Sequence, residues 1–135
     1  MTERVGYSGK RLVDKLGVRS GDVLATVNAP PNYDALVSPL PTGARRSDGE
    51  IEGARILHLF VRSRLELETV IGSVFNARPT GGMVWISWPK RSSTMFLDLT
   101  EDGVREIVLP TGWVDVKVCA VDTDWSGLKF LRRRT

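Results

Sequence analysis

The apolar run at residues 83–88 is the strongest constraint on how this chain folds. It reads Met-Val-Trp-Ile-Ser-Trp, follows a Gly-Gly pair and precedes Pro89. A strand that is apolar on both faces is typical of the centre of a parallel sheet, where helices cover each side. Because proline has no amide hydrogen, we expect strand pairing to stop at Pro89. Trp88 and Lys90 should then emerge at the carboxyl end of the strand, the edge where open α/β sheets bind ligands.

A strand–helix–strand unit leads into this run. Residues 54–61 read as a second buried central strand. Ser63 and Glu66 follow with the spacing of a capping box, which marks the start of a helix. Apolar residues then repeat at helical spacing through residues 67–75. The pattern predicts two parallel strands joined by a right-handed helical crossover.

The N-terminal residues carry a short helical pattern. Residues 8–17 place apolar side chains at helical spacing, and Gly17 suits the left-handed position that ends a helix. Residues 6–10 superficially resemble a phosphate loop, although Arg11 stands where a Ser or Thr should follow the lysine. We therefore favour a capped helix with Lys10 at the surface. The alternative is that Lys10 lies beside an anionic ligand.

The first strand of the sheet is followed by a turn without glycine. Residues 23–27 predict a buried strand, and Asn28 and the pair Pro30 and Pro31 follow it. Proline supplies no amide donor, so this turn is a poor cradle for a phosphate group. The segment that follows leaves room for one short helix and one brief strand, which we expect near residues 44–46.

The C-terminal third predicts a helix and a hairpin. Residues 98–101 can cap a helix whose apolar side ends near Val108. Residues 113–121 alternate in polarity, and a turn then leads to residues 125–131, as in an antiparallel pair. We therefore predict a three-layer α/β fold with a mostly parallel sheet and a C-terminal antiparallel hairpin. Residues 1–135 should form a single domain.

Composition agrees with one ordinary globular domain. Hydrophobic residues make up 41% of the 135 residues and charged residues 26%, and the net charge is +3. The single cysteine cannot form an internal disulfide, and the polar first ten residues do not resemble a signal peptide. No apolar run approaches the roughly 20 residues of a membrane span. We expect a cytoplasmic protein that does not enter a membrane.

No catalytic or metal-binding set is evident. His58 is the only histidine and lies between two leucines in the middle of a predicted strand. A core histidine with satisfied hydrogen bonds is favoured there over a catalyst. Cys119 also falls within a strand, and one histidine and one cysteine give no metal-ligand spacing. The sequence thus leaves the question of an enzyme open and favours a protein without catalysis.

Parts of the chain resemble class I S-adenosylmethionine-dependent methyltransferases. Residues 15–18 and 21–24 are similar to the helix, turn and first strand of these enzymes. Residues 79–87 are similar to their fifth strand with its Gly-Gly turn, and the closing hairpin is also similar. The resemblance implies a truncated, Rossmann-like methyltransferase topology. Because residues 28–31 replace the Gly-rich first motif and residues 45–47 replace the segment with the acidic ribose ligand, we expect no bound cofactor and no methyl transfer.

A closer resemblance is to an uncharacterised bacterial family, a domain of unknown function of about this length. The resemblance covers almost the whole chain. It rests on residues 6–10, 28–30, 87–90, 98–101, 114–122 and 125–129. It implies the same reduced methyltransferase-like fold and supplies no activity.

Several polar side chains fall at the carboxyl ends of the predicted parallel strands, which share one edge of the sheet. Lys90 and Arg91 add positive charge there, and Trp88 offers a flat apolar wall. Helix N-termini near Ser63 and Asp98 add amide donors for an anion. The alternative is that Trp88 packs on a helix and Lys90 is simply exposed. The candidate ligand-binding residues are Lys10, Asn28, Ser63, Ser87, Trp88, Lys90 and Arg91.

These observations support three hypotheses for function. The first is a non-catalytic module that binds a small anionic ligand or a protein partner at the carboxyl edge of the sheet. The second is an enzyme with altered S-adenosylmethionine binding. The third, which the sequence favours least, is a nucleic-acid-binding module that uses Trp88, Lys90 and Arg91. The short first-strand side of the sheet also predicts an open edge, and with it a homodimer.

Overall fold

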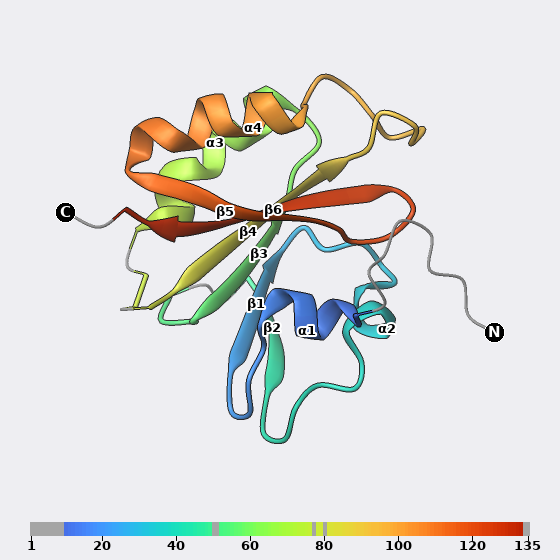
Figure 1. Ribbon diagram of the computed structural model, residues 1–135, viewed down its shortest axis with the longest axis vertical. Coiled ribbons are helices and arrows are strands. Elements are labelled where there is room, and N and C mark those ends of the chain that lie inside the picture. Colours follow the sequence, from blue (N-terminus) through green and yellow to red (C-terminus); the bar gives the residue numbers. More distant parts are fainter. Residues whose placement is uncertain (1–9, 50–51, 77, 80, 134–135) are drawn as a thin grey trace.

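The computed structural model describes residues 10–49, 52–76, 78–79 and 81–133 (Figure 1). The elements in chain order are α1 (Leu12–Leu16), β1 (Val23–Val27), α2 (Tyr33–Val37), β2 (Arg45–Asp48), β3 (Ile56–Phe60), α3 (Arg64–Phe75), β4 (Met83–Pro89), α4 (Glu101–Val108), the 3-10 helix η1 (Leu109–Thr111), β5 (Trp113–Ala120) and β6 (Trp125–Arg132). Ser8 and the phosphate-loop-like residues 6–9 lie outside the described residues, and α1 begins at Leu12.

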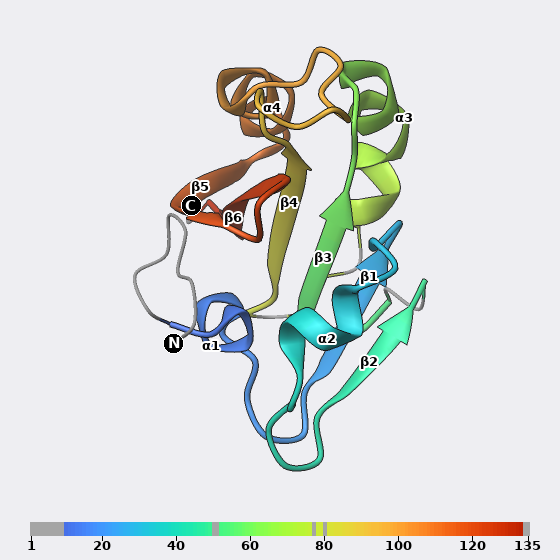
Figure 2. The same cartoon turned by 90° about the vertical axis from the view of Figure 1, so that its right-hand side faces the viewer.

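The six strands form one sheet in the order β2-β1-β3-β4-β6-β5. The pairs β1–β2, β1–β3 and β3–β4 are parallel, whereas β4–β6 and β5–β6 are antiparallel. Figure 2 shows α3 and α4 on one side of the sheet and α1 and α2 on the other. The predicted α/β class, with a mostly parallel sheet and a C-terminal antiparallel hairpin, is confirmed.

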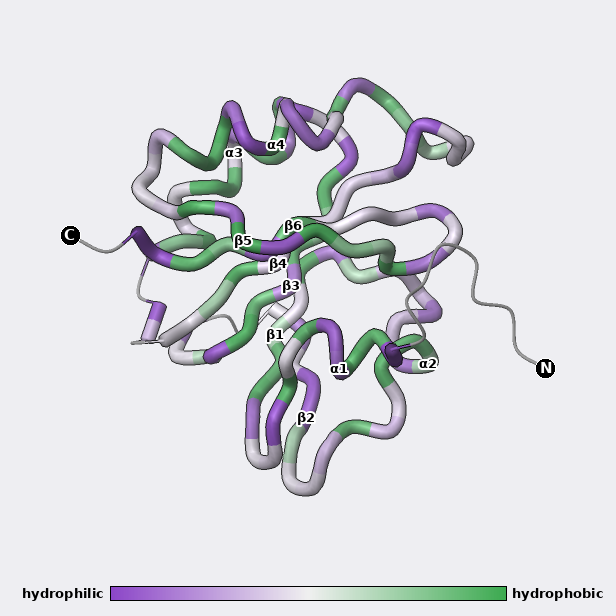
Figure 3. Tube along the Cα trace, in the orientation of Figure 1, coloured by the Kyte–Doolittle hydropathy of each residue, from purple (hydrophilic) through white to green (hydrophobic). Residues whose placement is uncertain are grey.

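The sheet buries a separate core on each face. Along β3, Leu57 and Leu59 pack with α3 and α4, whereas Ile56 and Phe60 pack on the opposite side with α1 and α2. All five residues of β3 and all seven of β4 are buried, which explains why their sequences show no alternation of polarity. In Figure 3, hydrophobic and hydrophilic segments alternate along α3 and α4, as expected of helices that bury one side only.

Side chains cap both long helices at the predicted places. Ser63 Oγ accepts a hydrogen bond from the Glu66 amide at 3.0 Å, and Thr100 Oγ1 accepts one from the Gly103 amide at 3.1 Å. The Glu66 carboxylate does not return to the Ser63 amide as in a standard capping box. It accepts from the amide of Arg62 at 2.7 Å, one residue earlier, and so fixes the turn between β3 and α3.

The prediction that strand pairing stops at Pro89 is confirmed, since β4 ends there, but the two neighbouring strands differ in where their pairing with β4 ends. Pairing with β3 ends at Ser87, but pairing with β6 continues to Pro89 opposite Trp125. The Lys90 amide then donates to the Asp124 carbonyl at 2.7 Å. Backbone groups of successive residues point alternately to the two neighbouring strands, and the Ser87 carbonyl faces the β3 side. The nitrogen of Pro89 therefore faces the β3 side, where pairing has already ended at Ser87. The absence of its amide hydrogen removes no hydrogen bond between strands.

Within the described part of the chain, no helix is long and apolar enough to cross a membrane. The longest helix, α3, has 12 residues, whereas a span needs about 20. The cytoplasmic location remains a prediction.

Candidate functional site

A cleft of about 490 Å³ opens at the carboxyl ends of β1 and β3. The chain runs from β1 outward to β2 and then returns to β3 on the other side of β1, so strand order reverses at this point. Open α/β sheets bind ligands at such a reversal, because the loops diverge there and leave a crevice. The lining residues are Asn28, Ala29, Pro30, Pro31, Asn32, Phe60, Arg62, Glu66, Met95, Asp122, Asp124 and Trp125.

The turn after β1 forms one wall of this cleft. Asn28 ends the strand with a φ of 61°, a left-handed conformation that asparagine tolerates better than most residues. Its side-chain amide donates to Glu66 Oε2 at 3.5 Å, which links the β1 turn to α3. Pro30 and Pro31 follow and present no amide hydrogens to the cleft.

The cleft carries both signs of charge. Glu66 accepts from the Arg62 amide, and Asp122 Oδ1 accepts from the amides of Asp124 and Trp125 at 2.8 and 2.9 Å, so both carboxylates already hold turns in place. The Arg62 guanidinium and the Asp124 carboxylate make no side-chain hydrogen bond or ion pair with any described residue. These two groups are therefore available to a ligand.

Aromatic rings form the inner wall. Phe60 and Trp125 meet edge to face, with ring centroids 4.9 Å apart and an interplanar angle of 86°. The His58 ring stacks on the Phe60 ring, with ring centroids 4.3 Å apart. The wall is rigid because each ring packs against another in a preferred geometry.

A buried polar chain lies behind this wall. Tyr33 Oη lies 2.8 Å from His58 Nδ1, and His58 Nε2 lies 2.7 Å from Ser87 Oγ. His58 has no exposed surface, and burial lowers its pKa to about 3, so the imidazole is neutral. Burial also raises the pKa of the Tyr33 hydroxyl. The prediction that His58 is a core histidine with satisfied hydrogen bonds is confirmed.

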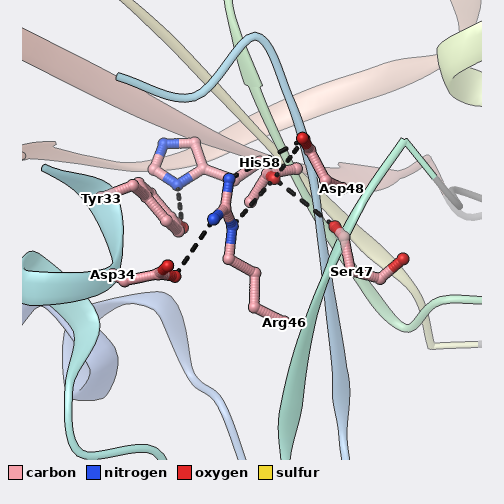
Figure 4. Close-up of polar contacts among 7 residues, drawn as sticks. Tyr33, Asp34, Arg46, Ser47, Asp48 and His58 are labelled. Carbon is pink, nitrogen blue, oxygen red and sulfur yellow. Dashed lines mark hydrogen bonds and ion pairs between the residues drawn. The ribbon is translucent and has the colours of Figure 1, made fainter. Parts of the chain in front are cut away.

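Arg46 links the hydrogen-bonded side chains of Tyr33 and His58 to the end of β2 (Figure 4). Its guanidinium lies 5.2 Å from the centre of the Tyr33 ring and 3.1 Å from Asp34 Oδ1. It also donates to Thr26 Oγ1 at 3.2 Å and lies 3.8 Å from Asp48 Oδ1. Asp48 lies one residue beyond residues 45–47, the segment in which the sequence showed no acidic ligand, and so it was missed. An acidic residue does stand at the carboxyl end of β2, and Arg46 neutralises it.

Two of the predicted site residues lie in the interior. Trp88 packs with the core under α3 and α4 and is not among the residues that line the cleft. Ser87 is fully buried and faces His58. Successive side chains of a strand point to opposite faces, which places Trp88 with Ile86 on one side and Ser87 on the other. Trp125, at the start of β6, is the tryptophan that lines the cleft, with 4% of its surface exposed.

The other predicted residues lie at different places. Asn28 lines the cleft, and Ser63 caps α3. Lys90 and Arg91 follow β4 but are not among the lining residues, and the Arg91 guanidinium lies 5.7 Å from the centre of the Phe96 ring. Lys10 is exposed just before α1 and is not among the residues that line the cleft.

Three of the amide donors at the start of α3 are already engaged. The Arg62 amide donates to Glu66 Oε1, the Arg64 amide to Asp98 Oδ1 at 3.0 Å, and the Glu66 amide to Ser63 Oγ. Most of the amides that could bind an anion at this helix start therefore have an acceptor within the chain. Two carboxylates of the chain itself occupy the position that an anion would take. In the part of the chain that the structure describes, no group of His, Cys, Asp and Glu side chains is placed to hold a metal ion.

Comparison with known proteins shows the class of fold. No family model matches the chain, and no curated protein matches its sequence. The structure is similar to ribosomal protein L11 methylase from Lactobacillus delbrueckii subsp. bulgaricus, with a TM-score of 0.64, 10% identity, and coverage of 91% of this chain and 75% of the other. It is also similar to an O-methyltransferase family 2 protein from Planctomyces limnophilus, with a TM-score of 0.62, 12% identity, and coverage of 84% and 50%.

A third similar structure carries its cofactor. Magnesium protoporphyrin IX methyltransferase from Synechocystis PCC 6803 with bound S-adenosylmethionine has a TM-score of 0.55, 10% identity, and coverage of 90% of this chain and 74% of the other. Together these structures show that the chain has the fold of class I methyltransferases. Identities this low show the fold alone, and the domain-of-unknown-function family remains a prediction.

Proposed function

We propose that this chain is a small-molecule-binding module, built on a methyltransferase-like fold, that does not transfer methyl groups. The observation that carries the proposal is the cleft at the strand-order reversal, where the Arg62 guanidinium and the Asp124 carboxylate have no partner among the described residues and aromatic rings form the wall. A cleft of about 490 Å³ is within the usual range for small ligands, roughly 300–1,000 Å³.

The charges of the cleft favour a ligand that bears both a cationic and an anionic group. Arg62 suits the anionic group, and Asp124 suits an ammonium group. A purely anionic ligand would meet three carboxylates, those of Glu66, Asp122 and Asp124, against one arginine. We therefore narrow the sequence-based hypothesis of a small anion to a zwitterion with a flat apolar part, which Phe60 and Trp125 would contact.

The residues of the cleft do not fit S-adenosylmethionine in the way that Rossmann-like folds hold nucleotides. Those folds use a Gly-rich turn after the first strand, so that backbone amides approach the ligand closely. Here Pro30 and Pro31 supply no amides, and the helix that follows has only five residues. Asp48, at the end of β2, is held by Arg46 and Thr26.

Calorimetric titration with S-adenosylmethionine and S-adenosylhomocysteine tests the absence of methyl transfer. We expect no binding at submillimolar concentration. A micromolar dissociation constant for either compound would contradict the proposed absence of methyl transfer and favour an enzyme with altered cofactor binding.

A thermal-shift series tests the ligand chemistry. L-phenylalanine carries both charges and a ring, phenethylamine lacks the carboxylate, and 3-phenylpropionate lacks the amine. We expect the amino acid to stabilise the protein more than either relative. The variants D124N and R62Q should each weaken its binding at least tenfold, since a charge-assisted hydrogen bond contributes about 1.5–3 kcal/mol.

Matched surface variants separate binding from a general charge effect. D14N removes an exposed carboxylate from α1, and R91Q removes a cation that does not line the cleft. Both should bind like the unchanged protein. Equal stabilisation by all three compounds, or equal loss in all four variants, would refute the zwitterion site. Binding of a protein or of nucleic acid in place of all three compounds would support the alternative functions.

A further inference from the structure

A second groove lies at the opposite edge of the sheet. It has a volume of about 460 Å³ and lies between the end of α3, the turn before β5 and the end of β6. In Figure 1 these segments lie on the side where the C-terminal end is marked, away from the β1–α2 turn. The lining residues are Ile71, Gly72, Phe75, Asn76, Thr111, Gly112, Trp113, Arg132 and Arg133.

The charge of this groove is entirely positive. Arg132 and Arg133 line it, and none of its lining residues is acidic. The Arg132 guanidinium lies 5.4 Å from the centre of the Trp113 ring, and the Arg133 amide donates to the Gly112 carbonyl at 2.8 Å. Neither guanidinium forms an ion pair with a described residue. Arg132 and Arg133 thus place two guanidinium groups without an ion-pair partner among the described residues beside one concave surface.

The glycine at position 72 is a second, independent observation that favours an open groove, because nothing in the described fold requires a glycine there. It lies inside the 12-residue helix α3, where glycine costs about 1 kcal/mol relative to alanine. A Cβ atom at this position would meet no atom within 4 Å, so no neighbour in the described fold requires a glycine. Its φ is not in the left-handed region, so the helix does not require one either. The missing side chain leaves room above the groove floor.

We propose that this groove binds a small ligand that carries phosphate groups. Guanidinium groups pair with phosphate oxygens through two parallel hydrogen bonds, and they do so without losing their charge. The volume suits a small molecule better than an extended chain. The ligand lies over Gly72, with its phosphates toward the two arginines. This site is separate from the cleft of the proposed function and does not depend on it.

A purely structural role for the arginines makes a different prediction. Cations near a helix C-terminus stabilise the helix dipole, and α3 ends at Phe75 in this groove. In that case, replacement of the arginines would lower stability, and no phosphate compound would bind.

Calorimetric titration with inorganic pyrophosphate and with ATP at low ionic strength tests the proposal. We expect both to bind the unchanged protein, and the double variant R132Q/R133Q to bind each at least tenfold more weakly with little change in melting temperature. Tighter binding of ATP than of pyrophosphate would identify a nucleotide as the ligand, whereas equal binding would identify the phosphate groups alone.

Two further variants separate loss of binding from loss of stability and from a general effect of charge. Gly72→Leu replaces glycine by a good helix former, so it should raise the melting temperature and still abolish binding, because the leucine fills the groove. The control K90Q/R91Q removes the same charge from the carboxyl edge, where the sequence alone placed an anion site, and it should bind normally. Absence of binding by the unchanged protein, or loss in the control but not in R132Q/R133Q, would overturn the proposal.

Discussion

His58 illustrates how a polar side chain can be built into a core at the scale of a single residue. Its two ring nitrogens lie at 2.8 and 2.7 Å from Tyr33 and Ser87, so neither is left without a partner. The neighbouring strand makes room for this arrangement. A Cβ atom on Gly127 would lie 3.0 Å from Ser87 Oγ, so a larger residue on β6 would push the serine toward the histidine.

The neutral state of His58 predicts a pH-dependent stability. Burial lowers its pKa to about 3, whereas the unfolded chain has the ordinary value near 6.5. Between these values the unfolded state binds more protons, so the free energy of unfolding falls as the pH falls below about 6.5. We expect a slope of up to about 1.4 kcal/mol per pH unit from this residue.

Chemical denaturation at a series of pH values between 7 and 4 measures that slope. The variant H58Q keeps polar atoms near Tyr33 and Ser87 but does not titrate, so its stability should depend less on pH over this range. Other groups, such as Asp22, whose pKa the hydrogen bond from Arg55 lowers, act equally in both proteins and cancel in the comparison. The same slope in both proteins would contradict this account of His58.

At the scale of elements, the hairpin of β5 and β6 contains a like-charge pair. Lys117 lies directly opposite Lys129 in the antiparallel register. Burial, followed by the charge of Lys117, lowers the pKa of Lys129. Like charges opposite each other destabilise a strand pair by a few tenths of a kcal/mol to about 1 kcal/mol.

Reversal of one charge should therefore stabilise the hairpin. We expect Lys117→Glu to raise the free energy of unfolding by about 0.5 kcal/mol, because an attractive pair replaces a repulsive one. Urea denaturation of this variant beside Lys90→Glu, which has no cross-strand cation, gives the comparison. A gain of the same size in Lys90→Glu would mean that only the net charge matters, and high salt should reduce the gain in Lys117→Glu.

Helices and strands with a long, uniform hydrophobic pattern could be predicted from the sequence. The face of the sheet on which each residue of a buried strand lies could not. The helical stripe and cap of α3 and the apolar runs of β3 and β4 leave little choice of element. When both faces of a strand are buried, however, apolar residues occupy every position, and nothing in the pattern tells which side Trp88 faces. The cleft residues Asp124 and Trp125 were missed because they lie in the turn and at the start of the second strand of the antiparallel hairpin. Only the pairing of β6 with β4 brings them to the carboxyl edge.

At the scale of the whole molecule, the two outer strands differ in how well they resist association. β2, the edge on the first-strand side, has four residues, Arg45–Asp48, with three charged side chains. Short, charged edges discourage pairing with another chain. β5, the opposite edge, has eight residues and leaves 51% of Val116 and 52% of Val118 exposed. The open edge was predicted on the first-strand side, whereas β5 is the more open of the two edges in the structure.

We therefore expect the homodimer, which remains a prediction, to form through β5. Exposed β-branched side chains on an edge favour pairing with a second strand, and a lysine directed outward from such an edge opposes it. Light scattering at high micromolar concentration should give the mass of a dimer for the unchanged protein and that of a monomer for Val118→Lys. Arg45→Glu, which reverses a charge on the β2 edge, should remain a dimer. A monomer for the unchanged protein would refute association, and a monomer for Arg45→Glu but not for Val118→Lys would return the interface to the β2 edge.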